Sequence, residues 1–68
     1  MLMRMATFEE DYTGKNIRFT HDDGTEYSGR LSRQERFSDD EDDVWIDLPE
    51  GESIRLRLRR KTSLDLLD

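Results

Sequence analysis

Three arginines at alternate positions, Arg55, Arg57 and Arg59, have the type and spacing that come closest to a binding site in this sequence. In an extended strand every second side chain points to the same side, so the three guanidinium groups would form a cationic stripe. Such a stripe beside an aromatic ring suits the phosphates and stacked bases of single-stranded RNA. The predicted RNA-binding residues are Arg18, Arg30, Trp45, Arg55, Arg57 and Arg59.

The stripe also has a structural interpretation. The expected strand pairing places Asp47 opposite Arg55, Asp43 opposite Arg59, and Trp45 opposite Arg57. The carboxylates would then neutralise the arginines, while the indole ring covers their aliphatic stems. From the sequence, both interpretations stay open.

An acidic run is the second candidate site, and it comprises Asp39, Asp40, Glu41, Asp42 and Asp43. Hard cations prefer carboxylate oxygens, but the run lacks the alternating spacing and central glycine of a calcium loop, so we expect no metal. A dense negative segment can dock on a basic protein. We predict a protein-binding surface here, with a solvated loop as the alternative.

No pattern indicates catalysis. His21, the only histidine, lies at an expected turn beside Asp22, and nothing in the pattern places a nucleophile and a carboxylate around it. The chain has no cysteine, so it has neither disulfides nor a thiolate metal site. We expect a protein that is not an enzyme and uses no cofactor.

Composition limits the remaining classes. The 68 residues make one small domain, residues 1–68, with a net charge of −6. A negative protein is not drawn loosely to nucleic acid or to anionic membranes. No apolar run approaches the roughly 20 residues of a membrane span, and the start does not resemble a signal peptide. We therefore expect a cytoplasmic protein.

Alternation of apolar and polar residues predicts five strands. They run over residues 16–20, 27–31, 44–48, 54–59 and 63–67, and residues 32–43 are expected to be irregular. Thr7 and Glu10 have the spacing of a capping box, which predicts a short helix over residues 8–12. Before Thr7 the chain is expected to fray.

Turn chemistry sets the expected registers. Residues 22–24 have the pattern of a three-residue loop with a left-handed Gly24, which places Phe19 opposite Tyr27 and Ile17 opposite Gly29. Gly29 leaves room for the sharp bend that a small barrel requires. A five-residue loop over residues 49–53 would place Ile46 opposite Leu56 and Val44 opposite Leu58.

The first hairpin resembles the Sm-like family of small barrels. The family motif reads Gly-Lys-x-apolar-x-apolar and then Asp-Gly-x-x-Tyr-x-Gly-x-Leu, and here it stands as Gly14-Lys15, Ile17, Phe19, Asp23-Gly24, Tyr27, Gly29 and Leu31. The family's RNA-binding segments, an Asp-x-x-Met-Asn run and an Arg-Gly pair, have no counterpart, so no base-pocket residue carries over. The resemblance implies a five-stranded SH3-like barrel with a short N-terminal helix.

The second half is similar to Rof, a family of Sm-like inhibitors of the transcription-termination factor Rho. The similarity lies in Gly51-Glu52, in the alternating residues 54–58, and in Lys61-Thr62-Ser63. It implies a regulator that blocks an RNA-binding site with an acidic surface.

The sequence thus predicts an all-β (small α+β) Sm-like barrel that acts as a non-catalytic binding or regulatory module. The leading partner is a nucleic-acid-handling protein with a basic surface. One alternative partner is single-stranded RNA. Another is a second copy of the chain, in a ring or other homo-oligomer built through edge strands, for which the outward Leu67 on an uncovered last strand is the hint.

Overall fold

The computed structural model describes residues 3–67 as a single antiparallel sheet. Its strands are β1 (Met3–Thr7), β2 (Asn16–Thr20), β3 (Glu26–Arg36), β4 (Glu41–Asp47), β5 (Ser53–Arg59) and β6 (Ser63–Leu67). Their order in the sheet is β1-β6-β2-β3-β4-β5, so β1 and β5 are its two edges. The all-β class is confirmed, but the sheet is open and six-stranded instead of a closed five-stranded barrel.

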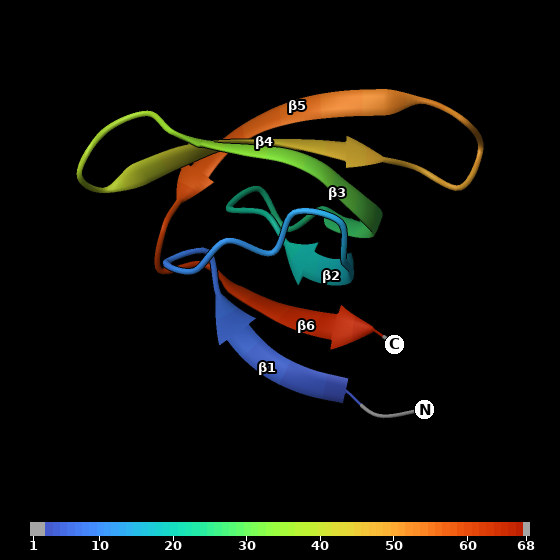
Figure 1. Cartoon of the computed structure of the whole chain (residues 1–68), viewed down its shortest axis with the longest axis horizontal. Coiled ribbons are helices and arrows are strands. Elements are labelled where there is room, and N and C mark those ends of the chain that lie inside the picture. Colours follow the sequence, from blue (N-terminus) through green and yellow to red (C-terminus); the bar gives the residue numbers. More distant parts are fainter. Residues whose placement is uncertain (1–2, 68) are drawn as a thin grey trace.

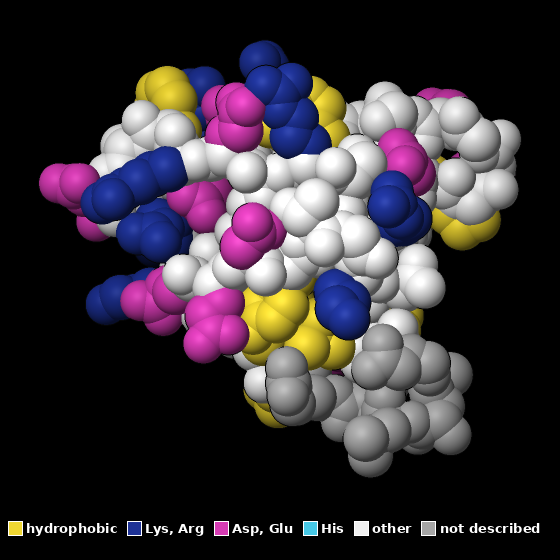
Figure 2. Space-filling model, in the orientation of Figure 1, with side chains coloured by type: hydrophobic (Ala, Val, Ile, Leu, Met, Phe, Trp, Pro, Cys, Tyr) yellow, Lys and Arg dark blue, Asp and Glu magenta, His cyan; other side chains and the backbone are white. Residues whose placement is uncertain are grey.

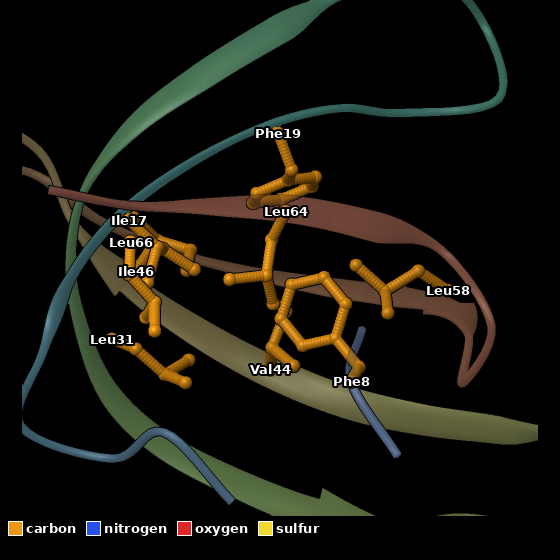
Figure 3. Packing of buried hydrophobic residues seen from close by; sticks show 9 residues of the cluster. All are labelled: Phe8, Ile17, Phe19, Leu31, Val44, Ile46, Leu58, Leu64 and Leu66. Carbon is orange, nitrogen blue, oxygen red and sulfur yellow. The ribbon is translucent and has the colours of Figure 1, made fainter. Parts of the chain in front are cut away.

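The sheet folds over itself, with β3, β4 and β5 in one layer and β6 and β1 in the other (Figure 1). The space between the layers holds the core, whose buried side chains meet there (Figure 3). Phe8 meets Phe19 edge-to-face, with ring centroids 5.3 Å apart, a geometry that aromatic pairs prefer. The buried core residues are Phe8, Ile17, Phe19, Leu31, Val44, Ile46, Leu58, Leu64 and Leu66.

The β2–β3 hairpin has the predicted turn and register. The amide of His21 donates to the Thr25 carbonyl at 2.8 Å, and Gly24 has a φ of 87°. A positive φ is strained for residues with a Cβ, which explains glycine at this position. The observed pairs, Phe19 with Tyr27 and Ile17 with Gly29, confirm the prediction.

The predicted β4–β5 register is wrong by two residues. Ile46 pairs with Ile54, and Val44 pairs with Leu56. The reason is a shorter turn than expected, because the Leu48 amide donates to the Glu52 carbonyl at 2.7 Å and leaves only residues 49–51 in the loop. Gly51, with a φ of 98°, repeats the construction of the first hairpin. Since the side-chain period of a strand is two, the shift leaves the inner and outer faces unchanged.

The predicted N-terminal helix is wrong. Thr7 ends strand β1, and its hydroxyl accepts from the Glu9 amide at 3.4 Å in a single turn that does not continue as a helix. Five residues form too few backbone hydrogen bonds to offset the cost of starting a helix. Pairing of β1 with β6 holds the preceding residues extended instead. The predicted fraying is therefore also wrong for residues 3–7, and residues 1 and 2 lie outside the described residues.

The stretch predicted to be irregular, residues 32–43, is mostly strand. β3 continues to Arg36 through a bulge between Leu31 and Arg33, and β4 already begins at Glu41. Apolar alternation is missing there because polar side chains, including Gln34 and Asp42, occupy the inward positions.

The last strand is not an edge of the sheet. β6 pairs with β2 on one side and with β1 on the other, so Leu67 lies opposite both Met3 and Asn16. The expectation of an uncovered last strand is therefore wrong. Among the described strands, β1 and β5 are the ones that another chain could extend.

Candidate functional site

The outward side of β3, β4 and β5 carries two aromatic rings with arginines placed over them; we call it the arginine face. Trp45, on β4, lies between Arg33 of β3 and Arg55 of β5. The guanidinium carbon of Arg33 lies 4.6 Å from the centroid of the indole ring. At that distance the ring quadrupole attracts the cation.

Phe37, just beyond the end of β3, is the second ring of the arginine face. It is 51% exposed, and the guanidinium carbon of Arg57 lies 3.3 Å from its centroid. Arg57 is held in place because its Nε donates to Asp43 Oδ1 at 2.9 Å. This hydrogen bond lowers the pKa of Asp43 and raises the pKa of Arg57. The contact presents a flat cation stacked on an accessible ring.

Within the stripe predicted from the sequence, the three arginines differ in their partners. Arg57 is paired with Asp43, whereas Arg55 and Arg59 are exposed and form no ion pair with any described residue. The observed register explains this difference, since Arg55 lies opposite Trp45 and Arg59 lies opposite Glu41. The expected pairs of Asp47 with Arg55 and Asp43 with Arg59 do not occur.

Arg18 does not extend the stripe, whereas Arg30 lies on the outward side of β3 but is paired with an acid. Arg18, on β2, pairs with Asp65 of β6 at 3.3 Å, and β3 and β4 separate β2 from β5 in the sheet. Arg30 pairs with Asp47 across β3 and β4 at 3.7 Å. The structure therefore gathers Trp45 with the stripe, keeps Arg30 on the same outward side with Asp47 as its partner, and places Arg18 elsewhere.

The acidic run is divided among three environments. Asp39 and Asp40 lie exposed at the tip of the β3–β4 hairpin, where Asp39 pairs with Arg36 at 2.8 Å. Glu41 and Asp43 are on the outer side of β4. Asp42 points inward and is only 3% exposed. Strand alternation thus removes Asp42 from any docking surface and leaves Asp43 bound to Arg57.

The buried carboxylate of Asp42 belongs to a polar cluster that we call the end cluster, made of Gln34, Asp42 and Arg60. Asp42 Oδ1 lies 3.3 Å from Arg60 Nε, and Asp42 Oδ2 accepts from Gln34 Nε2 at 3.1 Å. Gln34 also donates to the Phe8 carbonyl at 3.0 Å. The end cluster therefore ties the segment after β1 to β3 and β4 and keeps Phe8 in the core.

An open cleft of about 540 Å³ lies beside the end cluster. Its lining combines acids with bases, namely Glu9, Ser38, Asp39, Asp40, Glu41, Arg59, Arg60 and Lys61. On the face drawn in Figure 2, acidic and basic side chains are likewise interleaved, so neither sign forms a patch of its own there. A cleft of mixed sign does not select an ion of one charge.

His21 connects two parts of the sheet. Its Nε2 lies 3.2 Å from the carbonyl oxygen of Arg57, which can only accept, so Nε2 is the donor. This contact joins the β2–β3 turn to edge strand β5. Among residues 3–67, no group of histidine and carboxylate side chains is arranged to hold a metal ion.

Sequence reasoning missed Arg33 and Phe37, which lay in the stretch expected to be irregular. It also missed the end cluster. Polar residues spaced by two at Gln34 and Arg36, opposite Val44 and Asp42, were the available signal for a strand. That signal carries no apolar alternation, so periodicity alone does not detect it.

Comparisons with known protein families, with curated proteins and with solved structures find no match to this chain. In the part of the chain that the structure describes, no helix is long and apolar enough to cross a membrane.

Proposed function

We propose that this chain is a non-catalytic, cytoplasmic binding module of the Sm-like type that binds single-stranded RNA on its arginine face. The observation that carries the proposal is the pair of rings, Trp45 and Phe37, each with a guanidinium group over it. Single-stranded nucleic acids bind to surfaces that combine aromatic rings with cations, because the bases stack on the rings and the phosphates are attracted to the cations.

The Sm-like part of the proposal has its own support. The two ends of the motif meet, because the Gly14 amide donates to the Leu31 carbonyl at 2.7 Å and the Leu31 amide donates to the Lys15 carbonyl at 2.9 Å. Between them, the left-handed Gly24 closes the hairpin as the motif requires.

The net charge of −6 works against RNA binding, and the arginine face has to overcome it locally. Arg55 and Arg59 are the cations available for phosphates, since ion pairs engage Arg33 and Arg57. A base would stack on the guanidinium group that covers each ring, or on the ring once that group moves aside, and such stacking would contribute at most about 1–3 kcal/mol per base. We therefore expect weak binding that depends strongly on salt.

The test uses the fluorescence of Trp45, the only tryptophan in the chain. Titration with a single-stranded RNA should quench this emission in low salt. The double substitution Arg55→Gln/Arg59→Gln should weaken binding, and the slope of log affinity against log salt should become shallower by roughly 0.7 for each phosphate that the variant no longer neutralises. Lys15→Gln/Lys61→Gln, which also removes two exposed positive charges but none from the arginine face, is the matched control. Equal binding by the arginine variant and the control would refute the proposal.

A second candidate is a protein partner with a basic surface. The exposure of Asp39, whose side chain is 95% exposed, and of Asp40 at the hairpin tip favours it. The docking surface would then be this tip and not the whole acidic run. A capture experiment with Asp39→Asn/Asp40→Asn as bait should lose partners that the matched variant Glu50→Gln/Glu52→Gln retains. A ring or other homo-oligomer would have to use the edges β1 and β5, and the mass in solution tests for it.

A further inference from the structure

Strand β5 is an edge of the sheet, and the side chain of His21 contacts this edge at the Arg57 carbonyl. The seven residues of β5 pair with β4, and no described strand lies on its other side. The contact of His21 with the Arg57 carbonyl is a side-chain contact, so it leaves the remaining backbone groups of that edge without a strand. A regular edge of this length presents alternating N–H and C=O groups that an extended segment can pair with.

The backbone of β5 has no feature of its own that prevents pairing with another strand. β5 contains neither proline nor glycine, and its ladder with β4 runs from Ser53 to Arg59 without a bulge. What it carries instead is charge, in the form of Arg55, Arg57 and Arg59 on its outer side. Arginines at every second position repel a basic strand, and a second copy of β5, but attract an acidic one.

The existing neighbour of β5 shows which side chains suit this strand. On the β4 side, Arg59 lies opposite Glu41 and Arg57 opposite Asp43, with a hydrogen bond of 2.9 Å in the second pair. A strand added on the free side would place its own carboxylates next to the same guanidinium groups. Arg55 and Arg59, which form no ion pair with any described residue, would gain the most.

The inner side of β5 indicates the other half of the partner's pattern. Leu58 is buried, yet Ile54 and Leu56, which point to the same side, are only half-buried. An added strand with apolar residues between its carboxylates would cover them. The charge on the outer side of β5 and the half-buried apolar residues on its inner side point to the same kind of partner.

We propose that the edge of β5 accepts an extended segment of another protein, with alternating acidic and apolar residues, as an additional antiparallel or parallel strand. The inference goes beyond RNA binding and does not rest on it. Because both ligands would use the side chains of Arg55 and Arg59, an acidic strand and RNA would exclude each other.

The probe is a capped peptide that alternates glutamate and valine and matches the seven residues of β5. On titration, amide resonances of residues 53–59 should shift, and their hydrogen exchange should slow, because new backbone hydrogen bonds form. A peptide with lysine in place of glutamate should not bind. A glutamate peptide N-methylated at every second residue should also fail, since it keeps its carboxylates but loses half of its backbone donors.

The protein variants are Arg55→Glu and, as the control with the same change in net charge, Lys15→Glu. The first should weaken peptide binding by about tenfold or more, and the second should leave it nearly unchanged. Three results would overturn the proposal: no shift in β5 at millimolar peptide, equal binding of the N-methylated peptide, or shifts confined to β1. RNA titration of the same proteins is a separate measurement, so failure of one proposal is distinguishable from failure of the other.

Discussion

Substitution of Gly29 by alanine should destabilise the protein more than alanine at the other glycines. Gly29 lies on β3 where this strand closely approaches β4. An added Cβ would overlap the carbonyl oxygen of Asp47 and would lie 3.0 Å from Ile46 Cγ2. The obstacle is backbone, so β4 itself would have to move. At Gly24 there is nothing within 4 Å of such a Cβ, and only the positive φ opposes alanine.

The structure allows an estimate of both costs. Forcing an extra methyl group into a packed site costs about 1–3 kcal/mol, and a displaced ladder loses roughly 1 kcal/mol for each hydrogen bond broken. Replacing a glycine lowers the entropy of the unfolded chain, which returns about 0.4–1 kcal/mol. We expect a net loss of about 2–3 kcal/mol for Gly29→Ala and about 1 kcal/mol for Gly24→Ala. The loss is large for 68 residues, whose total stability should be about 3–10 kcal/mol.

The assay is thermal and urea unfolding followed by circular dichroism. At about 4–8 °C per kcal/mol, Gly29→Ala should lower Tm by roughly 10–20 °C, and Gly24→Ala by roughly 4–8 °C. Ser28→Ala, at an exposed neighbour on the same strand, should change stability by less than about 0.5 kcal/mol. A loss for Gly29→Ala no greater than that for Gly24→Ala would refute the close approach of β3 and β4 at this residue.

Two further predictions concern the charged residues. Asp42→Ala leaves Arg60 without its buried carboxylate and removes a partner of Gln34, so urea unfolding should show a loss of about 3 kcal/mol; a loss below about 1 kcal/mol would contradict the role of the end cluster. The hydrogen bond from Arg57 lowers the pKa of Asp43 below its ordinary 3.8. This stabilisation is fully present above the unfolded pKa and is lost as pH falls through the lower folded pKa. Between about pH 4 and pH 2, Tm should therefore fall less steeply for Asp43→Asn than for the natural chain, and parallel curves would count against the pair.

The sequence correctly predicted those parts of the fold that are set by residues close together in the chain. In the first hairpin, the turn residues and the alternating apolar side chains select the same register, so Phe19 and Ile17 find their predicted partners. In the second hairpin the turn signal was present, since Pro49 and Gly51 suit a tight three-residue loop. The predicted five-residue loop shifts the register by two residues and so gives the same inner and outer faces as the observed loop. The alternation of apolar and polar residues therefore could not reveal the error.

The candidate site was predicted in part. Trp45 and the arginines of β5 do share the outer side of the sheet, as period-two alternation requires. The partner of each arginine depends on register and on the neighbouring strand, and here the predictions were wrong. Arg33 and Phe37 come from a strand that shows no apolar period, and Asp42 looks in the sequence like its acidic neighbours although it is buried.

The sequence by itself determined the strand-forming segments around the apolar core, the side to which their residues point, and the first turn, because these follow from contacts a few residues apart. Only the tertiary structure decided that residues 3–7 form a strand, that the buried Asp42 meets the partly exposed Arg60, and that β5 and not β6 is an edge of the sheet. Those features depend on residues distant in the chain, whose pairing is chosen by the burial and hydrogen bonding of the whole sheet.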